Sequence, residues 1–190
     1  MKLYVKYKLN CNDIVKDYCQ KLIDSEWDHT TEKIFRIPNT DPIIDLLNNE
    51  MKYHGLSNIR AVSIFCRGKF NNQAIHRDTI NDNYDLCHSG FYIPLISAGS
   101  KLVWFNPDLG VNMEGVSRST ANSSNVTTTV LRVVYNNSKL PVIGEYAEHD
   151  PVIIRTHIPH RAETTDGLRA AISIRLVDNV DLFQHFKIEK

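Results

Sequence analysis

The second half of the chain places the strongest constraint on the fold. From Arg60 onward it is a series of short runs rich in β-branched and aromatic residues, separated by polar segments: AVSIFC, GFYIPLI, KLVWF, TTTVLRVVY, DPVIIRTHI and LRAAISIRLV. Such runs are typical of strands, because branched and aromatic side chains pack well on a pleated surface. The pattern predicts a mostly antiparallel β domain.

The first part of the chain has a different pattern, typical of helices. Residues 12–24 place apolar side chains at helical spacing behind an Asn/Asp start. A second helix is predicted after Thr40 or Asp41 as the cap, with Pro42 in the first turn and Gly55 as the stop. Helices followed by many strands favour a sandwich or jelly-roll barrel with helices against one face.

Two features modify this strand pattern. Pro94 within GFYIPLI predicts an edge, a bulge or a strand end, since proline cannot donate a ladder hydrogen bond. The region 106–150 is rich in Ser, Thr and Asn, and EGVSRSTANSSNV is its most loop-like part. The run TTTVLRVVY predicts that part of this region returns as a strand pair over one mouth of the sheet.

Composition excludes several classes of protein. A chain of 190 residues, 42% hydrophobic and 23% charged, fits one soluble globular domain spanning residues 1–190. Lys plus Arg and Asp plus Glu are equal at 22 each, so no global field draws the protein to nucleic acid. The amino terminus contains no apolar run typical of a signal peptide or a membrane span, which predicts a cytoplasmic location. The four scattered cysteines form no zinc-binding spacing and are expected to be reduced thiols.

The segment AIHRD contains the first candidate site residues. In an extended segment residues i and i+2 point the same way, so His76 and Asp78 can bind one ion. The later segment VIIRTHIPHRAE offers a distant third ligand, His160 or its neighbour His157. Two histidines and one carboxylate on one face of a metal form the facial triad that suits non-haem Fe(II).

These segments resemble a known family. HRD, GFYIPLISAGSKLVWF and VIIRTHIPHRAETTDGLRAAISIRL, in this order, are similar to the 2-oxoglutarate and Fe(II)-dependent oxygenases, particularly small bacterial and phage-type hydroxylase-like members. The resemblance implies a double-stranded β-helix (jelly-roll) core over residues 60–177. The helical amino-terminal part, 1–58, and a polar insertion at 107–148 lie outside the resemblance.

The resemblance also implies roles for particular residues. His76, Asp78 and His160 correspond to the iron ligands, and His160 is preferred to His157 because it directly precedes RAE. Arg169 corresponds to the residue that binds the distal carboxylate of the co-substrate 2-oxoglutarate. A guanidinium suits that role because its fork donates two parallel hydrogen bonds.

Two further residues belong to the expected co-substrate pocket. In a regular strand, Arg175 lies on the same face as Arg169, Ala171 and Ser173, and is therefore the rival anchor. Tyr92 is a candidate for a hydroxyl contact to the same co-substrate.

The implied activity is that of a dioxygenase using Fe(II), 2-oxoglutarate and dioxygen to hydroxylate an unidentified prime substrate. Asp78 favours hydroxylation over halogenation, because halogenating members of the family lack this carboxylate. Two alternatives stay open: a cupin-like metal protein that does not use 2-oxoglutarate, and a non-enzymatic β-sandwich interaction module.

Overall fold

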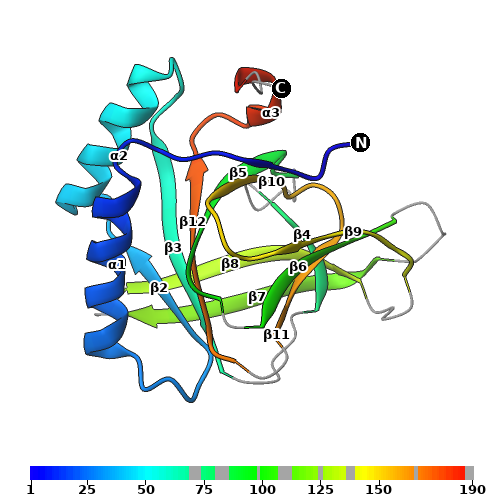
Figure 1. The fold of residues 1–190 in the computed structure, drawn as a ribbon. Coiled ribbons are helices and arrows are strands. Elements are labelled where there is room, and N and C mark those ends of the chain that lie inside the picture. The colour runs from blue at the N-terminus through cyan, green and yellow to red at the C-terminus, as the bar shows by residue number, and fades with distance from the viewer. Residues whose placement is uncertain are drawn as a thin grey trace.

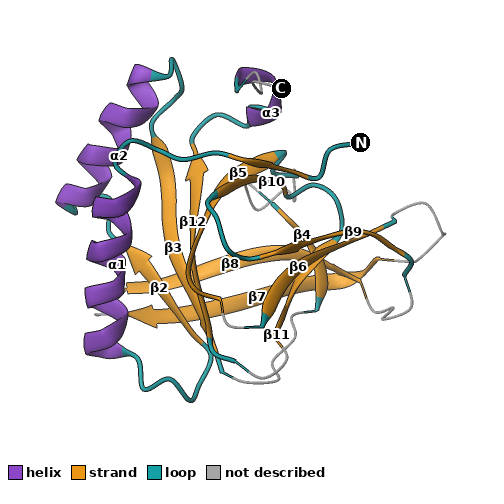
Figure 2. Cartoon of the chain, viewed as in Figure 1, coloured by secondary structure: helices purple, strands orange, loops and turns teal. Residues whose placement is uncertain are grey.

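The computed structural model describes residues 1–68, 74–79, 86–97, 99–106, 113–123, 126–135, 140–164 and 167–186. Within them the strands form two antiparallel sheets, and the helices α1 and α2 lie together against one side (Figures 1 and 2). The helices are α1 (Asn12–Glu26), α2 (Pro42–Tyr53) and a short α3 (Leu182–His185). None of the described helices is long and apolar enough to cross a membrane.

Each sheet contains strands that are far apart in sequence. The first sheet has the order β1 (Tyr4–Lys6), β10 (Val152–Arg155), β5 (Ser89–Ser97), β12 (Arg169–Leu176), β3 (Ile59–Arg67), β2 (Lys33–Ile37). The second has the order β7 (Met113–Ser123), β8 (Val126–Tyr135), β4 (Ile75–Asp78), β11 (His160–Thr164), β6 (Ser100–Phe105), β9 (Val142–Ala147). This arrangement confirms the predicted double-stranded β-helix core with helices at one side.

The two faces of the first sheet have different environments. On β12, Ala170, Ile172 and Ile174 pack into the apolar core beneath α1 and α2. The alternate residue Ala171 packs in a second cluster with Trp104 of the other sheet. The predicted common face of Arg169, Ala171, Ser173 and Arg175 therefore lies in the interior, between the sheets.

The predicted start of α2 is confirmed. The Asp41 side chain accepts a hydrogen bond from the amide of Ile43 at 3.0 Å, and Pro42 follows at the first helical position. Asp41 also accepts a hydrogen bond from the hydroxyl of Tyr18 on α1, a contact that raises the pKa of Tyr18 to about 12. Asp41 thus both caps one helix and joins it to the other.

Asp41→Ala is expected to lower the free energy of unfolding by about 1–2 kcal/mol, because it removes the cap and the contact with Tyr18. Asp45→Ala is the matched control: Asp45 is exposed in the same first turn and makes only the weaker interaction with the helix dipole. Urea denaturation of both variants measures the difference. Equal losses would show that the cap contributes nothing specific.

Other expectations need correction. The amino-terminal part is not wholly helical, since β1 and β2 pair with β10 and β3 of the core. The segment expected to be most loop-like, 114–126, lies mainly in β7, which pairs along β8. Its strand pairing outweighs the turn preference of its Ser and Asn residues. Pro94 is not on an edge strand: it lies opposite Ala171, beside a register shift in the pairing of β5 with β12, as the bulge alternative predicted.

Candidate functional site

Three of the predicted site residues meet in the interior. His76 and Asp78 lie on β4, and His160 is the first residue of the neighbouring strand β11. Antiparallel pairing sets His160 directly opposite His76, with ring centroids 4.6 Å apart. One potential ligand atom from each of the three residues lies within 4.8 Å of the others. The strand pairing thus places the third histidine beside the AIHRD segment, although the two are far apart in the sequence.

Backbone contacts define which nitrogen each histidine presents. His76 Nδ1 lies 2.8 Å from the carbonyl oxygen of Ala74, and His160 Nδ1 lies 2.9 Å from that of Ile158. A carbonyl oxygen only accepts, so both Nδ1 atoms donate, and in a neutral imidazole the lone pair then lies on Nε2. This is the usual arrangement of metal-binding histidines, whose other ring nitrogen donates to a backbone or carboxylate oxygen.

Asp78 is held by a cation on the opposite sheet. Its Oδ1 lies 3.5 Å from His76 Nε2, while its Oδ2 accepts a hydrogen bond from Arg175 Nη2. Burial alone lowers the pKa of Arg175, but the attraction of Asp78 outweighs it and the net pKa is raised. Arg175 therefore fixes one carboxylate oxygen of Asp78 and leaves the other facing the histidines.

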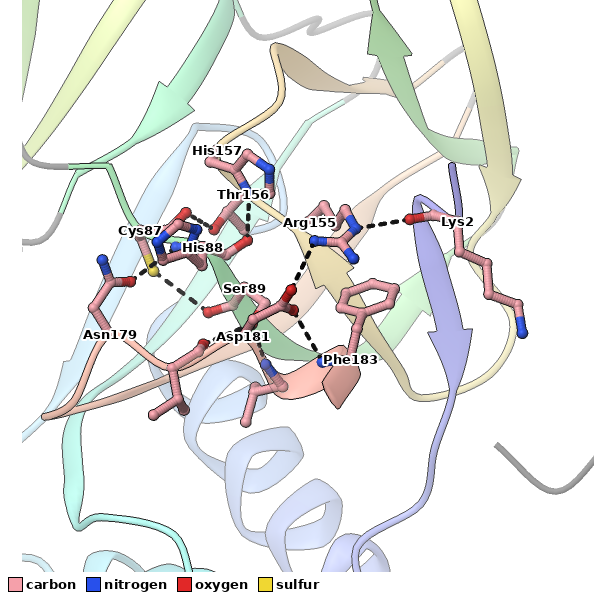
Figure 3. Close-up of polar contacts among 12 residues, drawn as sticks. Lys2, Cys87, His88, Ser89, Arg155, Thr156, His157, Asn179, Asp181 and Phe183 are labelled. Carbon is pink, nitrogen blue, oxygen red and sulfur yellow. Dashed lines mark hydrogen bonds and ion pairs between the residues drawn. The ribbon is translucent and has the colours of Figure 1, made fainter. Parts of the chain in front are cut away.

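The backbone of Asp78 is fixed by a second set of contacts. Its amide donates to the carbonyl of Thr156 at 3.1 Å, and its carbonyl accepts from the amide of Cys87 at 2.9 Å. Thr156 is fully buried, and its hydroxyl donates a hydrogen bond to the Cys87 carbonyl at 2.7 Å, which completes this network (Figure 3). The segment that follows β10 therefore holds the end of β4 in place.

His157 belongs to this supporting network and not to the three-residue group. Its Nδ1 lies 2.8 Å from the carbonyl oxygen of His88, and the two rings meet edge to face at 5.3 Å (Figure 3). Burial lowers the pKa of His157. Asn179 binds the amide of His88 at 2.9 Å, which joins the carboxyl-terminal segment to the same network.

Arg169 and Tyr92, the two expected co-substrate residues, lie together in the interior. Arg169 is 3% exposed, and its Nη2 donates a hydrogen bond to the Tyr92 hydroxyl. Burial raises the pKa of Tyr92 well above its usual value, so the phenol stays neutral. The Nη1 atom of Arg169 is buried and has no hydrogen-bond partner among the described residues. A buried donor without a partner costs free energy unless a ligand satisfies it.

A buried carboxylate, missed from the sequence, completes this pocket. Arg169 Nε lies 3.1 Å and 2.9 Å from the two oxygens of Glu148, which is fully buried. The hydroxyl of Ser100 donates to the same carboxylate at 2.7 Å. Burial lowers the pKa of Arg169, but the charge of Glu148 outweighs it and the net pKa is raised. In the sequence Glu148 adjoins His149 in a polar, turn-like segment, and nothing there signals burial.

Gly90 makes room for Arg175 and provides a test of its position. A Cβ at residue 90 would lie 1.7 Å from Arg175 Nη1 and 2.7 Å from its Cζ. Gly90→Ala is therefore expected to displace the guanidinium from Asp78 and to cost about 1–3 kcal/mol of stability. Chemical denaturation measures the cost. Gly55→Ala, at a site with open space but a positive φ, is a control for backbone strain alone.

The fold of this chain is similar to that of solved structures. A prolyl-4-hydroxylase from Pseudomonas putida aligns with 90% of this chain and 90% of its own, at a TM-score of 0.50 and 14% identity. HygX from Streptomyces hygroscopicus, solved with iron bound, aligns with 92% of this chain and 82% of its own, at a TM-score of 0.52 and 9% identity. These likenesses establish the shared fold. No family model and no curated protein sequence matches the chain.

Proposed function

We propose that this protein is an Fe(II)- and 2-oxoglutarate-dependent dioxygenase that hydroxylates an unactivated carbon of a small molecule or an amino-acid side chain. The observation that carries the proposal is the meeting of His76, Asp78 and His160 with their potential ligand atoms within 4.8 Å. Two imidazoles with protonated Nδ1 atoms and one carboxylate match the ligand set of non-haem Fe(II) oxygenases.

Arg169 and Tyr92 are the proposed co-substrate residues. Support comes from the buried Nη1 of Arg169, which has no hydrogen-bond partner in the described part of the chain, and from the adjoining Tyr92 hydroxyl. A carboxylate taken into this interior satisfies Nη1 with a charge-assisted hydrogen bond. Arg175 is a poorer candidate for the same role, because its Nη2 is already bonded to Asp78.

When bound, Fe(II) and 2-oxoglutarate supply oxidative decarboxylation and the transfer of one oxygen atom of dioxygen to carbon. The residues of the chain itself would bind these two groups and orient them. Arg175 pairs with one oxygen of Asp78 and keeps the other directed at the histidines. Fully buried Trp104, opposite His160 in the strand pairing, helps to exclude water from the interior beside the site.

One observation favours a second candidate, a metal-dependent protein that does not use 2-oxoglutarate. Glu148 already neutralises much of the charge of Arg169. A second carboxylate beside this pair would leave the pocket with a net negative charge, which a buried site tolerates poorly. The two candidates therefore differ in whether a dicarboxylic 2-oxo acid binds together with the metal.

Thermal denaturation with Mn(II), alone and with the unreactive 2-oxoglutarate analogue N-oxalylglycine, tests both. A ligand at 100 times its Kd adds about 2.7 kcal/mol of stability, and about 1 kcal/mol raises the Tm of a domain this size by roughly 2–4 °C. The dioxygenase predicts a rise of several degrees with Mn(II) and a further rise with the analogue only when Mn(II) is present. A rise with Mn(II) alone would favour the second candidate, and no response to metal would reject both.

A further inference from the structure

Glu148 already uses much of the binding capacity of Arg169. Its two carboxylate oxygens lie 3.1 Å and 2.9 Å from Arg169 Nε, and the neighbouring donor Nη2 is bonded to the Tyr92 hydroxyl. Nη1 is buried and has no hydrogen-bond partner within the described ranges of the chain. A ligand that enters beside Arg169 therefore meets Nη1 of a guanidinium whose charge is already shared with a carboxylate.

The carboxylate of Glu148 is fixed in this position. Glu148 is fully buried directly after β9, and its amide donates to the carbonyl of Ser100 at 3.3 Å. The Ser100 hydroxyl donates back to the carboxylate at 2.7 Å. The segment that follows is held by the Tyr146 hydroxyl, which donates to the carbonyl of Asp150 at 2.6 Å and accepts from its amide at 2.8 Å. A ligand in this pocket therefore meets the ion pair and not an isolated cation.

The charge of Glu148 changes what Nη1 of Arg169 can select. A carboxylate bound to Nη1 is attracted by Arg169 and repelled by Glu148, and both effects are strong because the two side chains are 3% and 0% exposed. A neutral carbonyl oxygen accepts the same hydrogen bond without the repulsion. Arg67, which lies opposite Arg169 on β3, has a carboxylate partner of its own in Glu32, at 2.6 Å. The usual advantage of a charge-assisted hydrogen bond is thus largely offset in this pocket.

We infer that Glu148 is a specificity-determining residue that removes most of the preference of the pocket for a distal carboxylate. The co-substrates that bind then include 2-oxo acids whose distal end is a neutral carbonyl group, such as a carboxamide, as well as 2-oxoglutarate. The inference rests on the proposed dioxygenase function, because that function assigns the distal end of the 2-oxo acid to Arg169. The other end of the ligand, the 2-oxo acid itself, is the same in both cases.

The test uses the full chain saturated with Mn(II) and two ligands that differ only in the distal group. N-oxalylglycine carries a distal carboxylate, and N-oxalylglycinamide carries a carboxamide of the same shape. Calorimetric titration gives the Kd of each, and the two values should differ by less than about tenfold in the wild type. In Glu148→Gln, N-oxalylglycine should bind at least about tenfold more tightly than in the wild type, because a charge-assisted hydrogen bond is about twice as strong as a neutral one. The affinity for N-oxalylglycinamide should stay unchanged.

Glu163→Gln is the matched control, since Glu163 pairs with Arg161 on β11, in the second sheet, and should leave both affinities unchanged. A purely structural role of Glu148 predicts weaker binding of both ligands by Glu148→Gln, and that result, or an unchanged ratio of the two Kd values, would overturn the inference. A preference of the wild type for N-oxalylglycine of more than about tenfold would overturn it without any variant, even if Glu148→Gln failed to fold. Failure of both ligands to bind the Mn(II)-loaded wild type would instead refute the dioxygenase proposal.

Discussion

His160→Ala is expected to abolish the stabilisation of the protein by Mn(II), whereas His157→Ala should retain it. The two histidines are three residues apart, but only His160 lies with His76 and Asp78. His157 binds the carbonyl oxygen of His88 instead. Loss of a residue that merely orients a ligand costs about 10–100-fold in metal affinity, so loss of a direct ligand should cost at least about 100-fold.

The measurement is a Mn(II) titration followed by Tm, with the free energy of unfolding of each metal-free variant determined separately. His160 is 4% exposed, so its replacement also leaves a cavity that lowers stability without metal. The decisive quantity is therefore the metal-dependent increment within each variant. A full increment in His160→Ala together with a lost increment in His157→Ala would reverse the assignment of the third ligand.

Arg169→Met is expected to be strongly destabilising, whereas the double variant Arg169→Met/Glu148→Met should recover most of the lost stability. Removal of one partner of a buried ion pair costs about 3–5 kcal/mol, because the other charge is left buried and unpaired. Replacement of both partners by apolar residues of similar size is often neutral or stabilising. Glu148 is fully buried and pairs with Arg169 at 2.9 Å, so this logic applies directly.

The double variant also isolates the co-substrate role of Arg169. It should fold and respond to Mn(II), yet give no further stabilisation with N-oxalylglycine and no succinate from 2-oxoglutarate. The single variant alone cannot separate lost binding from lost folding. Wild-type affinity for N-oxalylglycine in the folded double variant would exclude Arg169 as the anchor, and Arg175 would then be the residue to test.

The strand-rich half of the chain was predictable because its signal is local. Runs such as LRAAISIRLV place every second residue in the apolar core, and their branched residues favour strands wherever they pack. The cap at Asp41 was also predictable from the sequence, because an acidic residue before a proline at a helix start interacts with amides only a few residues away. The strands β2 and β7 were not: β2 is short and gains its stability from pairing with β3, and the Ser- and Asn-rich sequence of β7 is typical of a loop although it pairs along β8.

The candidate site was also predictable from the sequence only in part. The spacing of His76 and Asp78 gave their common direction on a strand, and the resemblance gave His160 and Arg169. The competition between His160 and His157 depended on which residue begins β11 opposite His76, and the four-residue segment HIPH cannot decide that by itself. The partner of Asp78, Arg175, lies on a different sheet and was known from the sequence only as a rival anchor.

The sequence by itself determined the class of fold, the start of α2 and the residue types able to bind a metal, because these follow from side-chain period, capping and ligand chemistry. Only the tertiary structure decided that Glu148 is buried against Arg169 and that Arg175 holds Asp78. Burial and charge pairing depend on residues far apart in the chain, so no local pattern encodes them.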